Sequence, residues 1–286
     1  MRINTNVSSL TAQEAAQNTS KSITSSLEKL STGLRINKAA DDASGLAIAD
    51  KLRTQGTSIK QGIANGNSAV TLLQIADKSM AEQSTILDTV KSKLIQANTA
   101  TTSTAGRLSI SKDVTKLLEQ LNNIAKQTNY NGTQLLQTGT TSAGLKSTSL
   151  TFQVGEKNTD MITMKAVQAN TAGLSLSALR NLTALTGDGG LTRLVASAQQ
   201  TKVDNAINAL NGFRGDIGST QNQVESGVRN LMTQATNIKA AESIIRDVDY
   251  AQESANFNKQ NIISQAGSYA ISQANSVQQN VLKLLQ

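Results

Sequence analysis

The sequence predicts a mainly α-helical protein, an elongated antiparallel helical bundle or coiled coil with a small β-hairpin region. Three observations support this fold class. Proline, which breaks helices most strongly, is absent from the 286 residues. Aromatic residues, which give thick globular cores their bulk, make up only 2% of the chain. Two long series of residues, nearly all apolar, recur at every seventh position, the spacing of one helix side that packs on another helix.

The first series predicts a helical rod over residues 43–98. Ile63 and Val70 strengthen the same face, and glycine occupies one position of the series, Gly66. The apolar members, which we assign to the rod seam, are Leu52, Ile59, Leu73, Met80, Leu87 and Leu94.

The second series predicts another rod over residues 193–248, and all its members are apolar. They complete the predicted seam: Val203, Leu210, Ile217, Val224, Leu231, Ile238 and Ile245. At a rise of 1.5 Å per residue each series spans about 60 Å, so the matching rods are expected to pair antiparallel. The heptad companion positions are polar and are expected to face water or neighbouring subunits; they include Asp77, Ser84, Lys91, Arg214, Gln221 and Glu242.

The region between the rods predicts one more helix and one hairpin. Apolar residues at three- and four-residue intervals predict a helix over Ser111 to Thr128, ended by Asn131 and Gly132, and the Thr-rich stretch 99–106 reads as a connection. LTFQV and DMITMK alternate apolar and polar residues around the turn GEKN, which predicts a β-hairpin near residues 150–165. TGDGG, residues 186–190, is typical of a loop.

Both ends of the chain predict weaker helices, rich in Asn, Gln, Ser and Ala. Their apolar positions include Ile23, Leu27, Leu30, Leu34, Ile263, Ala270, Val277 and Leu284. Such helices bury little surface alone, so we expect them to be unstable until they pack on something else.

The composition excludes most enzyme classes and several binding functions. With no cysteine and no histidine the chain cannot form a disulfide, a thiolate nucleophile or an ordinary zinc site. We therefore expect no catalytic residue, cofactor or metal. The net charge of +7 comes from scattered lysines and arginines, which does not indicate nucleic-acid binding. The chain has neither an apolar run long enough for membrane insertion nor the pattern of a conventional secretory signal.

Two acidic pairs are interpreted as structural rather than chemical. Asp41 and Asp42 precede a predicted helix, where acids favour the positive end of the helix dipole. Asp247 and Asp249 in RDVDYA indicate a helix junction or an ordinary surface pair.

Motifs at both ends resemble bacterial flagellins. LSTGLRINKAADDASGLAIADKLR, residues 30–53, resembles the family's N-terminal signature, and MRINTNVSSLTAQ resembles its start. NYNGTQLL, residues 129–136, is similar to the family's Asn-Gly turn, and residues 245–285 are similar to its C-terminal signature. The tail reads QANSVQQNVLKLL where the family usually has a proline, so we expect the helix to continue closer to the end.

The resemblance implies a structural subunit of the flagellar filament, with terminal helices in residues 1–42 and 250–286 forming the inner core. Residues 43–249 would form the helical rod domain. It also implies export by the flagellar type III system without a cleaved signal peptide, an extracellular location, and an export chaperone, filament cap and hook-junction proteins as partners beside the chain itself. The expected polymerisation core is Ile3, Val7, Leu10, Ile23, Leu27, Leu30, Leu34, Ile263, Ala270, Val277, Val281 and Leu284.

One segment departs from flagellins that activate the flagellin-sensing Toll-like receptor. Those resemble QRVRELAV where this chain has DTVKSKLI, so Thr89 replaces the first arginine and Lys93 replaces Leu or Glu. The departure predicts receptor evasion, similar to the pattern of the Campylobacter and Helicobacter group. The segment comprises Asp88, Thr89, Val90, Lys91, Ser92, Lys93, Leu94 and Ile95.

Two other functions stay open at this point. A hook-filament junction protein shares the terminal design, and a secreted adhesin or immune-receptor ligand would act as a monomer. Only about 50 residues separate the third helix from the second rod, too few for a typical separate outer domain. The metalloprotease insertion of some relatives needs an HExxH helix, and the chain has no histidine.

Overall fold

The computed structural model describes residues 5–138, 146–183 and 191–284, and the chain divides into two compact units. Unit 1 combines Met1–Thr57 with Thr236–Gln286, and unit 2 is Ser58–Ala235. Two long helices, α2 (Ala43–Asn98) and α5 (Arg193–Arg246), contribute to both units. Their bounds agree closely with the predicted rods.

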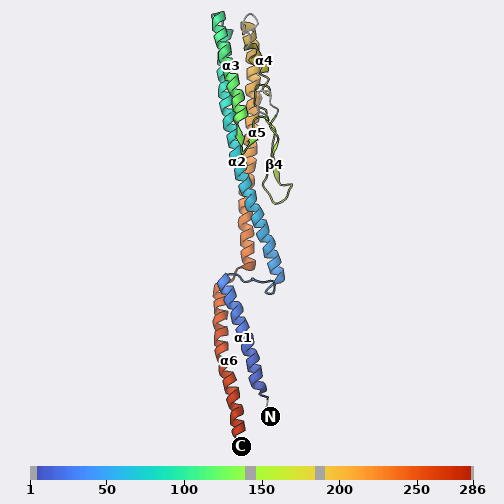
Figure 1. Cartoon of the computed structure of the whole chain (residues 1–286), viewed down its shortest axis with the longest axis vertical. Coiled ribbons are helices and arrows are strands. Elements are labelled where there is room, and N and C mark those ends of the chain that lie inside the picture. Colours follow the sequence, from blue (N-terminus) through green and yellow to red (C-terminus); the bar gives the residue numbers. More distant parts are fainter. Residues whose placement is uncertain (1–4, 139–145, 184–190, 285–286) are drawn as a thin grey trace. The chain divides into compact units, whose positions relative to one another are not determined.

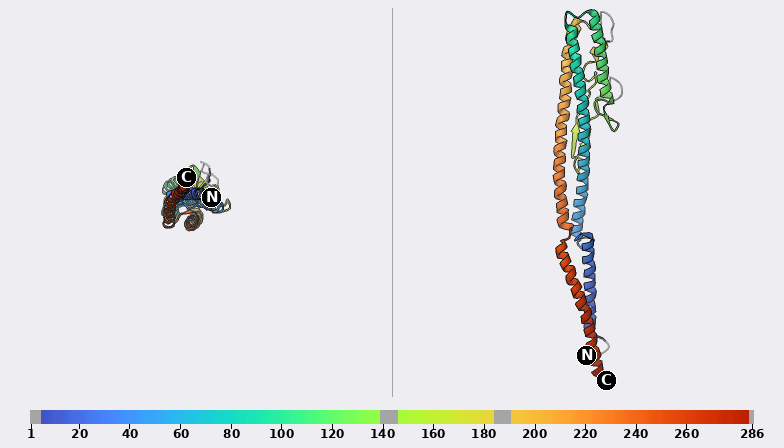
Figure 2. Two further views of the ribbon diagram at one scale, coloured as in Figure 1. Left: turned by 90° about the horizontal axis from the view of Figure 1, so that it is seen from below. Right: turned by 90° about the vertical axis from the view of Figure 1, so that its left-hand side faces the viewer.

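In unit 2, α2 and α5 run antiparallel and side by side (Figures 1 and 2). Gly62 faces Leu231 and Gly66 faces Val228. Further along α2, Asp77 pairs with Arg214 and Lys91 with Asp204. Residue numbers thus rise on one helix as they fall on the other, which confirms the predicted antiparallel coiled-coil pairing.

Glycine at position 66 of the first series has a packing reason. A Cβ built on Gly66 would collide with the Val228 side chain and lie 3.9 Å from that of Val154, which follows strand β3. Gly62 is equally crowded, because its Cβ would lie 2.7 Å from the carbonyl oxygen of Val154. The two glycines therefore let the hairpin and α5 approach the backbone of α2.

Helix α3 (Thr104–Gln127) packs antiparallel on α2. Arg107 Nε donates to the Ala97 carbonyl at 2.9 Å, and Gln83 Nε2 donates to the Leu121 carbonyl at 3.1 Å. The prediction that this helix starts at Ser111 was wrong. Ser103 caps the true start by accepting a hydrogen bond from Gly106 N at 3.2 Å, and the Thr-rich stretch hid that cap.

Four short strands and a short helix follow. β1 (Asn129–Tyr130) pairs with β2 (Thr133–Gln134) through Asn131 and Gly132, whose φ values of 50° and 80° define a tight hairpin turn. β3 (Leu150–Gln153) pairs antiparallel with β4 (Met161–Met164), which confirms the predicted hairpin. The sequence did not predict α4 (Ser177–Thr183), and the predicted TGDGG loop at 186–190 lies outside the described residues.

The apolar core lies in unit 2 between α2, α3, α5 and β4. Every predicted seam residue of this unit is buried: Ile59, Leu73, Met80, Leu87, Leu94, Val203, Leu210, Ile217, Val224 and Leu231. Strand β4 contributes Ile162 and Met164 on one face, while Met161 and Thr163 face outward. Leu135 and Leu136, which follow β2, are fully buried in the same core.

Unit 1 is built around a second antiparallel pair, α1 (Val7–Thr32) and α6 (Tyr250–Leu284). Asn6 Nδ2 donates to the Ala274 carbonyl at 3.1 Å, and Gly33 lies against the Tyr250 ring. Helix α6 runs without a break through Val277, as the missing proline predicts. The remaining seam residues, Leu52, Ile238 and Ile245, belong to this unit and are half-buried.

Candidate interaction surfaces

The contact between α1 and α6 is made by small side chains. Thr19 and Ser26 are the buried residues of α1, and Ala16 faces Gly267 of α6. Thr19 donates its hydroxyl proton to the Ala15 carbonyl at 2.9 Å, which satisfies a polar group in the contact. Small side chains bring the helices close together but remove little apolar surface from water.

Several of the larger apolar side chains of these two helices are exposed to solvent instead. Val7 is 61% exposed, Leu10 54% and Leu27 55%, and on α6 Ile262 is 67% and Tyr269 73% exposed. We call this set the outward apolar face; with its remaining members it comprises Val7, Leu10, Leu27, Ile262, Ile263, Tyr269 and Val277. These exposed apolar side chains are available for burial against another chain.

Some residues of the predicted polymerisation core belong to the outward apolar face, and others are half-buried. Ile23, Leu30 and Leu34 are half-buried, and Ala270 is exposed beside the members already named. Ile3 and the side chains of Val281 and Leu284 lie outside the described residues. The heptad reading missed Ile262 and Tyr269, which precede its members Ile263 and Ala270; aliphatic or aromatic character alone could have found them.

A short two-stranded junction joins the segments after α1 and after α5. Arg35 N donates to the Arg246 carbonyl at 2.7 Å, and Val248 N donates to the Gly33 carbonyl at 3.0 Å. The Arg35 guanidinium also donates to the Ile245 carbonyl at 2.6 Å. Gly33 has a φ of 72°, the left-handed conformation that glycine adopts most easily at a helix end. The two segments therefore hold each other in register.

Asp41, Asp42 and Asp249 accept backbone hydrogen bonds near this junction, and Asp247 accepts from the Ser243 hydroxyl at 2.6 Å. Asp42 Oδ1 accepts from Gly45 N at 2.8 Å at the start of α2, and Asp249 Oδ1 accepts from Ala251 N at 3.0 Å at the start of α6. Asp41 Oδ2 accepts from the backbone N–H groups of Lys38 and Asn37, each at 3.0 Å, and these bonds lower the pKa of Asp41.

Lys38 closes the same turn from the other side. Its Nζ donates to Glu28 Oε2 at 2.6 Å, and this hydrogen bond with its charge attraction raises the pKa of Lys38. The ion pair is exposed, so its contribution to stability is small. Its role is to connect the end of α1 to the loop before α2.

The polar companion positions of the rods bond to one another rather than only to water. Arg214 Nε donates to Asp77 Oδ1 at 2.9 Å, with about one third of each side chain exposed. Lys91 Nζ lies 2.6 Å from Asp204 Oδ1. Asp77, Lys91 and Arg214 are thus partly exposed, as expected for these positions, and they also form ion pairs within one chain because facing charges of opposite sign attract each other.

The segment 88–95 presents one polar side of α2. Val90 and Leu94 are fully buried in the core, whereas Asp88, Thr89, Ser92 and Ile95 are exposed. Both lysines of the segment are bound to acids of other helices, because Lys93 Nζ lies 3.0 Å from Asp113 on α3 and Lys91 pairs with Asp204.

Within the described part of the chain, no cluster of acidic residues could hold a metal ion. Among these same residues no helix is long and apolar enough to cross a membrane.

Comparison with known proteins identifies the relatives of this arrangement. The model of the bacterial flagellin N-terminal helical region matches residues 3–141, and that of the bacterial flagellin C-terminal helical region matches residues 200–285. Flagellin of Bacillus subtilis (strain 168) is 36% identical over 308 residues, and the flagellar filament 33 kDa core protein of Treponema phagedenis is 33% identical over 293 residues. Each alignment covers 100% of this chain and 100% of the relative.

A solved structure shares the fold at low identity. The structure described as a flagellar hook-associated protein from Vibrio parahaemolyticus has a TM-score of 0.60, with 12% identity over 72% of this chain and 99% of that chain. This likeness concerns the fold alone, whereas the sequence matches carry the family relationship.

Proposed function

The chain belongs to the bacterial flagellin family, and from that premise we propose how its parts divide the work of building a filament. It is a structural subunit of the extracellular flagellar filament and not an enzyme, and it assembles with copies of itself. We assign residues 1–42 and 250–286 to the inner core of the filament, and the rod domain 43–249 to the layer around it.

The outward apolar face supports this assignment. Its seven side chains are 42–73% exposed in the single chain, although each of them gains about 1.5–3 kcal/mol from full burial. Covering the whole face would therefore contribute on the order of 10 kcal/mol before ordering costs. The entropy lost when flexible ends become ordered opposes that gain, so contacts with several neighbours are required.

The rod domain supplies the complementary part of the mechanism. Its core in unit 2 is complete within one chain, because the seam residues of that unit on α2 and α5 are buried against each other, α3 and β4. We propose that this domain folds before assembly and that the terminal helices acquire their stability on the growing end. Contacts of this kind that do not close on themselves produce a helical polymer.

Truncation tests the division directly. We expect a chain without residues 1–30 or without residues 257–286 to remain a folded, helical monomer that forms no filaments by electron microscopy. Filaments that grow normally from both truncated chains would refute the assignment of the termini.

A matched pair of substitutions tests the face itself. Ile262→Gln removes a 67% exposed member of the face, whereas Leu194→Gln removes an 82% exposed leucine at the start of α5, outside the proposed core. We expect Ile262→Gln to raise the critical concentration for assembly at least tenfold more than Leu194→Gln. Equal effects would contradict the special role of this face.

We infer the partners in export and assembly from family membership. Secretion through the flagellar type III system is a general property of flagellins. We propose that the chain travels without a cleaved signal peptide and meets an export chaperone, the filament cap and hook-junction proteins on its route. Mass spectrometry of the filament protein would show an intact N-terminus if no signal is removed.

A second proposal concerns segment 88–95. Thr89 and Ser92 are exposed while Lys91 and Lys93 are held by Asp204 and Asp113, so the surface offers no unpaired arginine or lysine there. We propose that the flagellin-sensing receptor binds this surface poorly. Strong activation of reporter cells by the purified monomer would overturn that proposal.

A further inference from the structure

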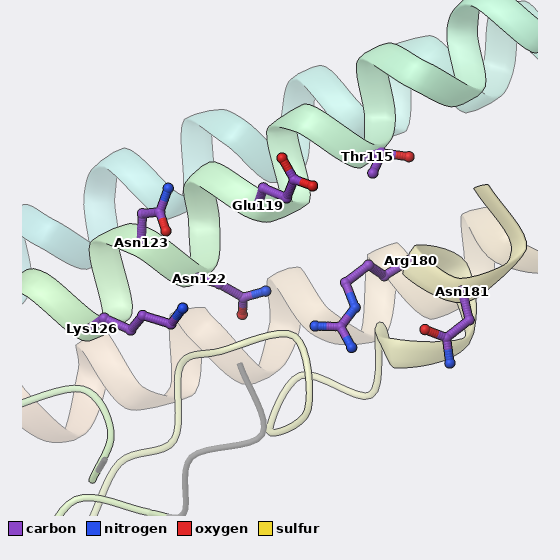
Figure 3. Close-up of a pocket in the computed structure, with 7 residues that line it drawn as sticks. All are labelled: Thr115, Glu119, Asn122, Asn123, Lys126, Arg180 and Asn181. Atoms are coloured by element: carbon purple, nitrogen blue, oxygen red, sulfur yellow. The ribbon is translucent and has the colours of Figure 1, made fainter. Parts of the chain in front are cut away.

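A polar hollow lies between α3 and α4 in unit 2, away from the surfaces described above (Figure 3). Four of its residues, at positions 115, 119, 122 and 126, follow the spacing of a single face of α3. Arg180 and Asn181 approach from α4. The lining residues all carry polar or charged groups, and they are Thr115, Glu119, Asn122, Asn123, Lys126, Arg180 and Asn181.

Asn122 supplies a fixed hydrogen-bond donor at the bottom of the hollow. Its side chain is 98% buried, and its Oδ1 accepts from Thr171 N at 2.9 Å and from Thr171 Oγ1 at 3.1 Å. Because a backbone N–H can only donate, the atom facing Thr171 must be the amide oxygen. The planar amide therefore turns Nδ2 the other way, toward the hollow, where it has no hydrogen-bond partner within the described residues.

The charges around this donor are mainly positive. Lys126 lies one helical turn beyond Asn122 on α3, and Arg180 extends from α4 toward Asn122 (Figure 3). Helix α4 is held in place by Leu176 and Leu179, which are both fully buried. Glu119 is the one acid of the lining, and Lys116 on the outer side of α3 binds it at 2.8 Å.

We propose that this hollow binds a small oxyanion: phosphate, sulfate or a carboxylate. The guanidinium of Arg180 and the amine of Lys126 match the negative charge, and Asn122 Nδ2 donates to one oxygen in a position already fixed before binding. Thr115 adds no donor, because its hydroxyl proton is given to the Ser111 carbonyl at 2.9 Å. A metal cation would meet two positive side chains, and the lining has no aromatic ring on which a neutral sugar could stack.

Inorganic phosphate titrated into the full-length monomer tests the site by calorimetry, with chloride keeping the ionic strength constant. We expect one saturable site per chain. Arg180→Gln or Lys126→Gln should each weaken binding at least about tenfold, the usual effect of losing one charge-assisted hydrogen bond. Lys112→Gln removes the same charge from an exposed position of α3 outside the hollow, and should change the affinity less than twofold.

Asn122→Asp is the sharpest variant. The aspartate still offers Thr171 an acceptor of the same shape but replaces the donor Nδ2 by a negatively charged oxygen, so phosphate binding should disappear while circular dichroism stays unchanged. If that variant misfolds, the two surface substitutions still decide the question. Heat that never saturates, or an equal loss in Lys112→Gln, would overturn the proposal, because either result indicates general charge screening or an adventitious ion only.

The same titration on assembled filaments distinguishes the source of the anion. Retained binding indicates a free anion, whereas binding that is lost on assembly indicates a carboxylate of a neighbouring copy in the hollow. The monomer experiment stands whether or not the terminal helices have the role proposed above.

Discussion

Replacing Gly66 by alanine should destabilise the rod domain, although alanine is the better helix former. The substitution gains about 1 kcal/mol of helix propensity. It also inserts a methyl group into the space of the Val228 side chain, which is 94% buried and, as a β-branched residue, has one strongly preferred rotamer in a helix. Overpacking of a filled core costs about 1–3 kcal/mol, so the expected net loss is about 0–2 kcal/mol.

Gly212→Ala is the matched control for this experiment. Gly212 lies in the interior of α5, and a Cβ built there has nothing within 4 Å. Only the propensity gain applies, so this variant should be more stable than the parent chain by about 1 kcal/mol. The free energies of unfolding of the two variants should therefore differ by about 1–3 kcal/mol, with Gly212→Ala the more stable.

Urea unfolding of the full-length monomer, followed by helical circular dichroism, measures both variants in one assay. Filament growth is avoided by working below the critical concentration. If Gly66→Ala and Gly212→Ala stabilise the chain equally, then Val228 does not occupy the space over Gly66, and the packing reason for that glycine is wrong.

Two further predictions follow from the charged contacts. In a double-mutant cycle of Asp77→Asn with Arg214→Gln, we expect a coupling free energy of about 0.5–1 kcal/mol in unfolding, because about one third of each side chain is exposed. A coupling free energy that stays unchanged from about 0.05 to about 1 M salt would contradict a surface ion pair. The pKa of Asp41 is lowered in the folded chain by its hydrogen bonds from the Asn37 and Lys38 amides. The stabilisation from these bonds is complete above the unfolded pKa of about 3.9, and it is lost as the pH falls through the lower folded pKa. The NMR chemical shifts of these two amides should change with pH with a midpoint below about pH 3.9, and this change should disappear in Asp41→Asn. A midpoint at or above that pH would contradict the proposed hydrogen bonds to Asp41.

Heptad periodicity predicted the rods well because the buried positions of two paired helices recur about every seven residues, which is close to two helical turns. Leu73, Met80 and Leu87 follow that period, and all are fully buried. The pattern also marked Gly66 as a break, but only the structure shows that Val154 of the hairpin and Val228 approach there. A single sequence contains no record of which distant segment fills the space over a glycine.

The surfaces were harder to predict than the core. Asp77 and Arg214 are polar positions whose partners lie 137 residues apart, so the sequence alone could not pair them. The short helix α4 and the strands β1 and β2 have too few residues for a periodic signal. The oxyanion hollow joins Asn122 to Arg180 through the fold of an intervening loop, and its key donor is defined by the hydrogen bonds of Thr171.

The antiparallel pairing of α2 with α5 also determines the order in which the chain can close. Lys91 and Asp204 meet across a shorter stretch of chain than Asp77 and Arg214, and Gly56 meets Ile238 across a still longer one. Loop-closure entropy grows with the enclosed length, but each contact already made shortens the next loop to a few residues on either side. We therefore expect the pair to close from Lys91 toward Gly56, and α1 and α6 to meet last. In that order the proposed assembly helices α1 and α6 would pair with each other only after the rest of the chain has folded.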